Sequence, residues 1–206
     1  MKHCETFLLH GFLGAPSDWD ELLVHMPGTA LAYPFSLDKL PSPFTLIGYS
    51  MGGRIALDFA IKNPEKIVSL ILISAHLGLK TDEERKKRLQ QDLLFAEQLE
   101  TTPFSQALER WYDQPLFASL KQKRDMLAMR SEQNPFQCAA MLRAHSLGLQ
   151  PDYSYKLPKQ TTLIAGEYDT KYRKHYETWP HQIVEGAGHA IHLEEPKRLA
   201  QTFLLT

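Results

Sequence analysis

The sequence predicts an α/β protein in which a doubly wound, mostly parallel sheet carries an inserted helical cap. Two observations predict the sheet: short apolar runs recur along the chain, and segments with helical periodicity separate them. Such runs are typical of parallel strands that helices cover on both faces. A third observation predicts the insertion, because residues 77–155 carry helical patterns and no strand pattern. We therefore expect a sheet domain of residues 1–76 and 156–206 and a helical cap of residues 77–155.

The bulk composition is that of an ordinary globular protein. The chain has 206 residues, of which 43% are hydrophobic and 23% charged, and its net charge is −1. This charge does not favour nucleic acid or an acidic membrane as a partner, and no apolar run reaches the about 20 residues that span a bilayer. The N-terminus lacks the long apolar region of a signal peptide, and Cys4 and Cys138 lie far apart in the chain. We expect reduced thiols, no metal site and a cytoplasmic location.

The first part of the chain predicts two strands joined by a helix. Residues 6–9 form a short apolar run that ends at a loop, where Gly11 and Gly14 permit tight turns and leave N–H groups exposed. The residues Ser17-Asp18-Trp19-Asp20 resemble a capping box, so we expect a helix that begins there and stops at Pro27-Gly28. Residues 29–33 form the second expected strand, and a proline-rich loop follows it.

The next stretch contains a G-x-S-x-G motif between a strand and a helix. Residues 44–47 have the pattern of a buried strand, residues 48–52 are Gly-Tyr-Ser-Met-Gly, and residues 54–60 have a helical pattern. A sharp strand-to-helix turn has no room for side chains at its flanks, which accounts for Gly48 and Gly52. Such a turn exposes the Ser50 hydroxyl at the N-terminus of the helix, where N–H groups and the helix dipole favour negative charge.

The second half of the chain contains the expected cap and the end of the sheet. After an apolar run at residues 67–73, we expect helices at about 81–100, 106–112, 121–132 and 135–147. Most of the charges from Lys80 to Lys87, Arg85 among them, are expected to lie on a solvated helix face. Strands are expected again at 161–166 and 181–184, and Pro196 lies near the start of a terminal helix over residues 197–204.

Ser50, Asp169 and His189 each follow the carboxyl end of an expected strand. The carboxyl ends of parallel strands share one edge of the sheet, so these three side chains can converge. A neutral His189 can take the Ser50 proton, and Asp169 would fix the histidine tautomer. Two alternatives stay open, Glu167 in place of Asp169 and His192 in place of His189. We favour Asp169 because Glu167 lies nearer the strand, and His189 because a glycine-rich turn places it at the tip of a loop.

Two backbone N–H groups and one cation complete the expected site. The N–H groups of Phe12, in the first glycine loop, and of Met51 would form an oxyanion hole. Arg54 follows Ser50 by four residues and so faces the same side of the expected helix, one turn further on. A guanidinium group near a buried site is costly unless an anion pairs with it. That anion is either a structural carboxylate or a carboxylate of the substrate.

The Ser, Asp and His motifs resemble the α/β-hydrolase family. Together with Arg54, the chain resembles more narrowly the 2-succinyl-6-hydroxy-2,4-cyclohexadiene-1-carboxylate (SHCHC) synthases of menaquinone biosynthesis. The narrower resemblance is carried by residues 48–54, 74–79, 84–88, 111–117, 127–131, 149–151, 165–172 and 187–189. It implies the α/β-hydrolase fold and a lyase that eliminates pyruvate from 2-succinyl-5-enolpyruvyl-6-hydroxy-3-cyclohexene-1-carboxylate. It also implies that the triad-activated serine is the base and that no cofactor is needed.

The resemblance further implies which residues bind a small polycarboxylate substrate. By matching motif, Arg54, Arg88 and Arg130 would bind substrate carboxylates, and Tyr49 and Trp111 would line the pocket. The alternative activity is that of a carboxylester hydrolase, which would form an acyl-serine intermediate. Several arginines favour a polyanionic substrate over a neutral ester.

The sequence departs from this family in one segment. Members usually carry an Asp-x-Pro-Gly-His-Gly loop and a further helix between the second strand and the nucleophile strand. Residues 33–43 hold only a short proline-rich connector here. One side of the sheet should therefore be thinly covered, and we expect a second copy of the chain, in a homodimer, to cover it.

Overall fold

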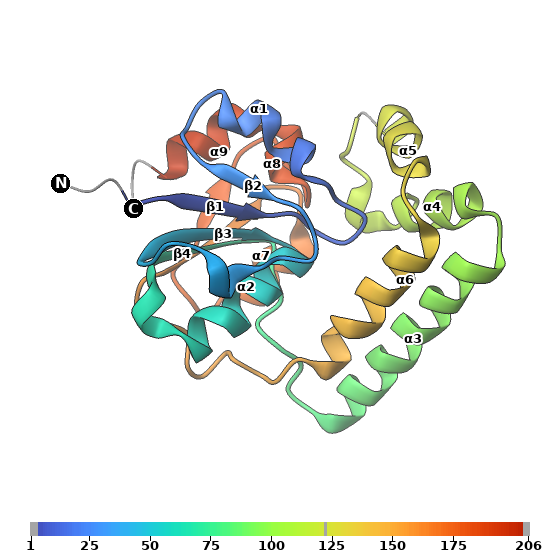
Figure 1. Ribbon diagram of the computed structural model, residues 1–206, viewed down its shortest axis with the longest axis horizontal. Coiled ribbons are helices and arrows are strands. Elements are labelled where there is room, and N and C mark those ends of the chain that lie inside the picture. The colour runs from blue at the N-terminus through green and yellow to red at the C-terminus, as the bar shows by residue number, and fades with distance from the viewer. Residues whose placement is uncertain (1–3, 122, 204–206) are drawn as a thin grey trace. The chain divides into compact units, whose positions relative to one another are not determined.

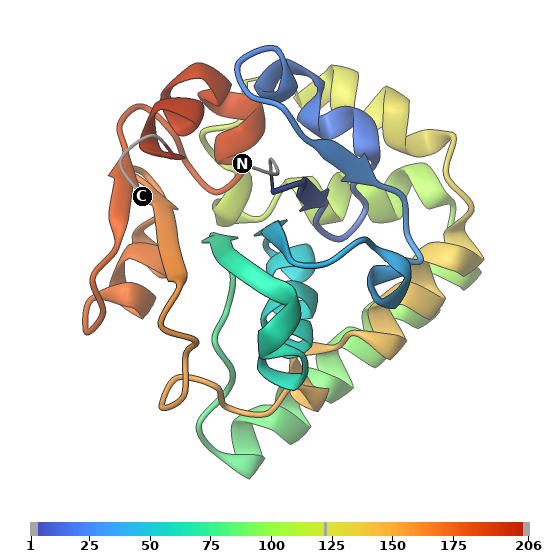
Figure 2. The same ribbon diagram turned by 60° about the vertical axis from the view of Figure 1, so that its left-hand side comes forward.

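The computed structural model describes residues 4–121 and 123–203 and divides the chain into two compact units. The sheet unit comprises Met1–His76 and Lys156–Thr206, and the helical unit comprises Leu77–Tyr155. In Figures 1 and 2 the sheet unit is coloured blue to cyan and orange to red, and the helical unit is mostly green to yellow.

The sheet unit contains one parallel sheet. Across residues 4–121 and 123–203, six strands lie in the order β2-β1-β3-β4-β5-β6, and every neighbouring pair is parallel. The strands are β1 (Thr6–Leu9), β2 (Thr29–Leu31), β3 (Phe44–Tyr49), β4 (Ile67–Ile73), β5 (Thr161–Gly166) and β6 (Gln182–Val184). The expected parallel sheet is thus confirmed. The chain passes from β1 to β2 toward one edge of the sheet and from β3 to β4 toward the other edge. In sheets of this kind ligands bind where the two directions part, here between β1 and β3, beyond the carboxyl ends of the strands.

Helices cover both faces of this sheet. The helix α2 (Met51–Lys62) packs on β3 and β4, whereas α1 (Asp20–Leu23), α8 (Ile191–Glu194) and α9 (Pro196–Phe203) pack with one another (Figure 1). The crossovers through α1 and α2 run in opposite directions along the sheet, so right-handed connections place these helices on opposite faces. The central strands are consequently buried on both sides, and Leu46 and Leu70 have no exposed surface.

The structure corrects four local expectations in the sheet unit. The first helix is short: a 3-10 turn, η1 (Pro16–Trp19), leads into α1, which ends at Leu23 well before Pro27. Its first turn is closed by Asp18, whose carboxylate accepts the N–H of Ala15 at 3.1 Å, and not by a capping box that starts at Ser17. The strand expected over residues 29–33 ends at Leu31. The helix α7 (Thr170–Tyr176) was not expected.

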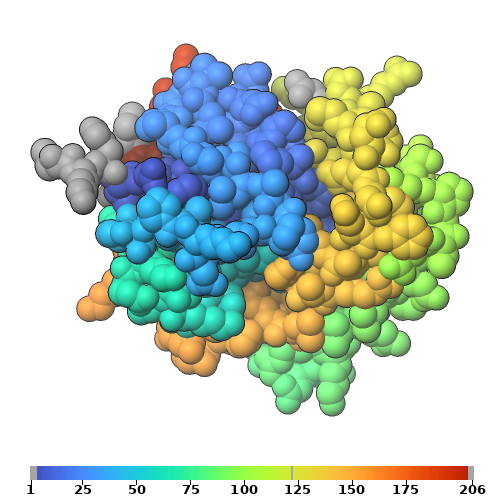
Figure 3. Space-filling view, viewed as in Figure 1, coloured from blue at the N-terminus to red at the C-terminus, as the bar shows by residue number. Residues whose placement is uncertain are grey.

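The connection between β2 and β3 contains little regular structure. Among residues 32–43 the only helix is a 3-10 turn, η2 (Leu37–Lys39). Most of this segment is exposed, and it forms part of the blue surface in Figure 3. The connector therefore lacks the α-helix that a doubly wound sheet usually has at this place.

The helical unit consists of helices in its described part. They are α3 (Asp82–Thr101), α4 (Phe104–Tyr112), α5 (Lys123–Ser131) and α6 (Pro135–Ala144), with 3-10 turns η4 (Pro115–Phe117) and η5 (Leu147–Leu149). Helix α3 packs against α6 and η5, and α4 packs against α5. Residue 122 of the expected third helix and residue 204 of the expected terminal helix lie outside the described residues.

Candidate active site

Ser50 lies in the sharp turn that joins β3 to α2. Its backbone has φ 50° and ψ −111°, a conformation that residues with a side chain rarely adopt. The turn is fixed by two hydrogen bonds: the Ser50 N–H donates to Ile73 O at 2.9 Å, and the Ser50 carbonyl accepts the Arg54 N–H at 3.1 Å. Strain of this kind, held by surrounding hydrogen bonds, is typical of functional sites.

The glycines around Ser50 are required by close packing. A Cβ on Gly48 would lie 2.5 Å from the Gly53 Cα, and a Cβ on Gly52 would collide with the carbonyl oxygens of Leu9 and His10. The turn therefore excludes side chains at both positions, as the G-x-S-x-G motif predicts.

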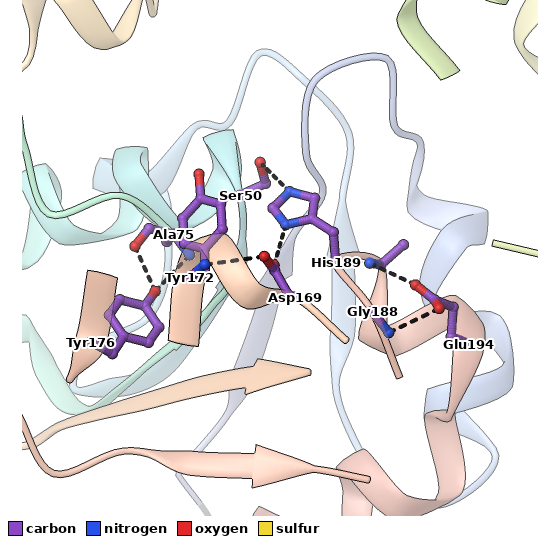
Figure 4. A network of polar contacts seen from close by, with 9 residues as sticks. Ser50, Ala75, Asp169, Tyr172, Tyr176, Gly188, His189 and Glu194 are labelled. Atoms are coloured by element: carbon purple, nitrogen blue, oxygen red, sulfur yellow. Dashed lines mark hydrogen bonds and ion pairs between the residues drawn. The ribbon is translucent and has the colours of Figure 1, made fainter. Parts of the chain in front are cut away.

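His189 connects Ser50 to Asp169 (Figure 4). The His189 Nδ1 is 2.7 Å from Asp169 Oδ2, and its Nε2 is 3.3 Å from Ser50 Oγ. The side chains of His189 and Asp169 are 2% and 0% exposed. The second carboxylate oxygen of Asp169 accepts the N–H of Tyr172 at 3.1 Å. When Nδ1 carries the proton and donates to Asp169, the Nε2 lone pair faces the Ser50 hydroxyl. In this arrangement His189 can accept the hydroxyl proton while Asp169 orients the imidazole ring.

Glu167 and His192, the two alternative residues for the site, make other contacts. The carboxylate of Glu167 accepts the N–H of Gly186 at 2.8 Å, so it serves the loop after β6. His192 is fully buried, and its ring centroid lies 4.5 Å from that of Trp19 and 4.4 Å from that of Tyr49. The geometry therefore brings Asp169 and His189, and not Glu167 or His192, to Ser50.

Two tyrosine rings flank His189. The ring centroids of Tyr49 and Tyr172 lie 5.2 Å and 4.9 Å from that of His189. Tyr49 was expected near the site, whereas Tyr172 was missed. It lies in α7, three residues after Asp169, and its recognition depends on a helix that the sequence pattern did not reveal.

A buried tyrosine links α7 to the chain segment beside the Ser50 turn. The hydroxyl of Tyr176 accepts the N–H of Ala75 at 2.7 Å and donates to the Ala75 carbonyl at 2.5 Å (Figure 4). A Cβ on Gly53 would lie 2.5 Å from the Ala75 Cβ, so this segment packs directly against α2. Complete burial raises the pKa of Tyr176 well above its usual value, and its phenol stays protonated as a structural group.

The glycine loop after β1 lies against the Ser50 turn. A Cβ on Gly11 would lie 2.8 Å from Tyr49 Cε1 and 3.5 Å from Ser50 Cβ. Phe12 follows directly in this loop, and Met51 is the first residue of α2. Of the two residues expected to form the oxyanion hole, Met51 thus adjoins Ser50 in the sequence, and Phe12 adjoins Gly11, which packs against the Ser50 turn. Arg54, one turn further along α2, is buried as well.

The remaining predicted binding residues belong to the helical unit. Arg88 donates from Nε to Asp92 Oδ1 at 2.8 Å, and Ser146 Oγ donates to Asp92 Oδ2 at 2.7 Å. Asp92 is buried, whereas the Arg88 side chain is 31% exposed. The terminal nitrogens of Arg88 bind no group within the described part of the chain, so the buried carboxylate orients a guanidinium group whose outer edge stays open.

Arg130 and Trp111 lie among aromatic residues of the helical unit. Arg130 is 2% exposed, and its Nε donates to the Tyr112 hydroxyl at 3.4 Å. The ring of Trp111 stacks on Phe95 with centroids 5.3 Å apart. A guanidinium group buried to this degree is costly unless polar partners surround it, which distinguishes Arg130 from an ordinary charge on a helix surface.

The expectation that the charges from Lys80 to Lys87 are solvated is wrong for Arg85. Its Nη1 donates to the Leu79 carbonyl at 2.6 Å, its Nη2 pairs with Asp82, and its side chain is 27% exposed. Arg85 therefore ties the start of α3 to the preceding segment. Its neighbours Lys86 and Lys87 are exposed, as expected.

Within residues 4–121 and 123–203, no group of three or more His, Cys, Asp or Glu side chains is placed to hold a metal ion. In the same part of the chain, no helix combines the length and the hydrophobicity needed to cross a membrane.

The strand order of the sheet and the sharp turn at Ser50 are features that point to one protein family. Residues 6–202 match the alpha/beta hydrolase family, and the chain belongs to that family. Within it, the chain is similar to SHCHC synthases. Those of Escherichia coli O1:K1 and Shigella sonnei are each 32% identical to it over 220 aligned residues, which cover 91% of this chain and 87% of each relative.

Solved structures show the same fold. The structure of MenH from S. aureus has a TM-score of 0.85 and 23% identity, and the match covers 97% of this chain and 92% of that one. A thermophilic esterase from Thermogutta terrifontis has a TM-score of 0.72 and 19% identity, with 98% and 88% of the two chains covered. At these identities the likeness shows the α/β-hydrolase fold, which confirms the expected fold class.

Proposed function

We propose that this protein is a lyase of menaquinone biosynthesis that eliminates pyruvate from 2-succinyl-5-enolpyruvyl-6-hydroxy-3-cyclohexene-1-carboxylate to give SHCHC. The observation that carries the proposal is the Ser50–His189–Asp169 contact in a chain that is 32% identical to SHCHC synthases over nearly its whole length. Ser50, Asp169 and His189 are the proposed catalytic residues.

Arginines bind the substrate carboxylates in this proposal. Arg54 of the sheet unit and Arg88 and Arg130 of the helical unit are assigned this role, and Tyr49 and Trp111 line the pocket. Support for Arg88 comes from its contacts: its Nε binds Asp92, which leaves both terminal nitrogens for a carboxylate. A guanidinium group binds a carboxylate best through two parallel hydrogen bonds from such an edge.

The proposed reaction begins with proton transfer. His189 Nε2 takes the hydroxyl proton of Ser50, and Asp169 stabilises the imidazolium that forms. Ser50 Oγ then takes a proton from the ring carbon beside a carbonyl group of the substrate, acting as a base. The negative charge that develops on the carbonyl oxygen is held by the N–H groups of Phe12 and Met51.

The reaction ends with loss of the enolpyruvyl substituent from the ring. The electron pair from the broken C–H bond forms a new ring double bond, the electron pair of the existing ring double bond shifts by one position, and the C–O bond to the enolpyruvyl group breaks. The enolpyruvate that leaves takes up a proton and becomes pyruvate. Ring product and pyruvate together contain all atoms of the substrate and no electrons are gained or lost, so acid–base groups suffice and no redox cofactor is required.

The proposal is tested by turnover of the purified protein. We expect pyruvate, measured with lactate dehydrogenase, and the ring diene, measured by its absorbance, in equal amounts. In water labelled with ¹⁸O, the ring product should gain no label. Elimination proceeds without an acyl-enzyme, so intact-protein mass spectrometry should find unmodified Ser50 during turnover.

A carboxylester hydrolase is the second candidate, because a serine activated by His189 can also act as a nucleophile. It would give a burst of the first product, an acyl group on Ser50 and one labelled oxygen in the carboxylic acid product. Observation of these three results with a productive substrate would replace the lyase assignment.

A further inference from the structure

Glu194 binds the backbone on both sides of His189. Its Oε2 accepts the N–H of Gly188 at 2.9 Å, and its Oε1 accepts the N–H of Ala190 at 3.0 Å (Figure 4). His189 lies between these two residues in the chain. In the described part of the chain, the Glu194 carboxylate binds these N–H groups and no cationic side chain.

One of these bonds has a local explanation and the other does not. Glu194 ends the short helix α8, and its own N–H donates to the Ala190 carbonyl at 3.0 Å. The side-chain bond to Ala190, the residue before α8, therefore resembles a capping box, in which an acidic side chain reaches back to the start of its helix. Gly188 lies outside α8, so the bond to its N–H fixes the loop and adds nothing to the helix.

Glu194 restrains the loop that carries His189 on both sides of the imidazole, whereas Glu167 holds the same loop further back, at Gly186. This loop runs from the end of β6 to the start of α8, and its Gly186 has φ 78°, a conformation that glycine adopts readily. The His189 Nε2 is 3.3 Å from Ser50 Oγ, close to the upper limit for a hydrogen bond. A small displacement of this backbone would therefore separate the two atoms.

We propose that Glu194 is a positioning residue for His189. By holding the N–H groups of Gly188 and Ala190 at once, its carboxylate fixes the backbone from which the imidazole projects, and so keeps Nδ1 on Asp169 and Nε2 on Ser50. The role rests on the proposed function of His189 as the base. A charged acceptor suits this task, since hydrogen bonds to a carboxylate are stronger than those to a neutral group.

The test compares Glu194→Gln with Glu194→Ala and with the control Glu195→Gln. A glutamine side chain has one acceptor oxygen, so it can hold only one of the two N–H groups, and alanine holds neither. Glu195 is the neighbouring carboxylate, and its side chain pairs with Arg198 at 3.5 Å. Its replacement removes the same charge from the same segment and leaves the loop bonds intact.

Two measurements are made on each variant. The first is the far-downfield proton NMR signal of the His189 Nδ1–H, which reports its bond to Asp169 without any substrate. The second is turnover, with kcat and KM determined separately. For Glu194→Gln we expect a shifted or broadened signal and a kcat lower by about tenfold to a hundredfold, with KM within about twofold of wild type. Glu195→Gln should match wild type in both.

The outcomes separate this inference from the proposed function. An unchanged signal and an unchanged kcat in Glu194→Gln, in a wild type that turns over the substrate, would show that Glu194 is only a helix cap and would overturn the inference. A wild type with the downfield signal but no pyruvate release contradicts the proposed substrate, and the signal in the variants still decides the role of Glu194. If Glu194→Ala does not fold, the milder Glu194→Gln carries the test.

Discussion

Ser50 has a backbone conformation that few serines adopt, and its neighbours maintain it. Its φ of 50° is stabilised by hydrogen bonds to Ile73 and Arg54, and glycines at positions 48 and 52 leave room for the turn. This backbone conformation places the Ser50 hydroxyl at the N-terminus of α2, where the helix dipole and backbone N–H groups favour an oxyanion. The same turn makes the hydroxyl accessible to His189.

The first prediction concerns the three residues in contact. If Ser50, Asp169 and His189 act as a unit, Ser50→Ala, Asp169→Asn and His189→Ala should each lower kcat by about 10³- to 10⁶-fold while the far-ultraviolet circular dichroism is unchanged. His192→Gln is the matched control, because His192 packs against Trp19 and Tyr49. It should lower Tm but retain most of the turnover. Near-normal turnover of His189→Ala would refute the assignment.

The second prediction concerns the two thiols. Burial raises the pKa of Cys138 to about 11, whereas Cys4 is exposed. Because the thiolate is the reactive form, iodoacetamide at pH 8 should modify Cys4 in the folded protein and leave Cys138 intact. Peptide mass spectrometry reads out both sites, and both should react after unfolding in guanidinium chloride. Equal labelling of the two thiols in the folded state would contradict the buried environment of Cys138.

The raised pKa of Cys138 also has a consequence for stability. Its folded-state pKa lies above its unfolded value, so the folded state binds the proton more tightly. This contribution is fully present below about pH 9 and is lost as the pH rises to about 11. Cys138→Ala should therefore show a smaller loss of unfolding free energy than wild type across that interval.

At the scale of elements, α3 shows how a long helix is begun and then used. Thr81 precedes it, the Thr81 hydroxyl accepts the Glu84 N–H at 3.2 Å, and the Glu84 carboxylate accepts the Thr81 N–H at 2.9 Å. These bonds lower the pKa of Glu84, because they favour its charged form. Arg85 ties this end of the helix to Leu79. With its start fixed in this way, α3 holds Arg88 and Asp92 one turn apart.

The third prediction concerns Arg88 on α3. If its terminal nitrogens bind a substrate carboxylate, Arg88→Ala should lower kcat/KM by a factor that corresponds to about 2–5 kcal/mol of transition-state stabilisation. Part of this loss comes from leaving an anion unpaired. Arg54→Ala and Arg130→Ala should have effects of the same size. Lys87→Ala is the control, since Lys87 is exposed on the same helix. Arg85 is unsuitable as a control because it is bound to Leu79 and Asp82. Equal losses for Arg88 and Lys87 would mean that Arg88 does not bind substrate.

At the scale of the whole molecule, the parallel sheet gathers residues that are distant in the chain. Ser50 and His189 are 139 residues apart in sequence, yet both follow strands whose carboxyl ends share one edge. At the other side of the sheet, β2 is a three-residue edge strand, and the connector after it contains only the turn η2. This connector therefore adds no α-helix to cover the sheet beside β2.

The fourth prediction concerns assembly. The homodimer expected from the short connector should appear in sedimentation velocity as a species of twice the chain mass of 23.6 kDa. Substitution of an exposed connector residue, as in Asp38→Arg, should shift the population toward monomer if the connector lies in the interface. A single species of one chain mass at all concentrations would contradict the dimer.

Residue patterns alone predicted most of the local elements and the chemistry they could carry. The apolar runs predicted the strands, Gly48 and Gly52 predicted the turn at Ser50, and the order Ser50, Asp169, His189 predicted which residues could meet. These features depend on neighbours within a few residues, since strand burial, helix capping and turn geometry are local properties of the backbone. For the same reason the helices of the inserted unit were placed almost at their observed bounds.

Chemically equivalent groups are distinguished by the contacts that they make in the folded protein. Glu167 and Asp169 are both acidic and both follow β5, but Glu167 binds the Gly186 N–H while Asp169 contacts His189. Arg85 and Arg88 lie one turn apart, yet one binds a backbone carbonyl and the other a buried carboxylate. Contacts of this kind depend on how loops close over a sheet after distant strands have paired, and that information is absent from any short window of sequence.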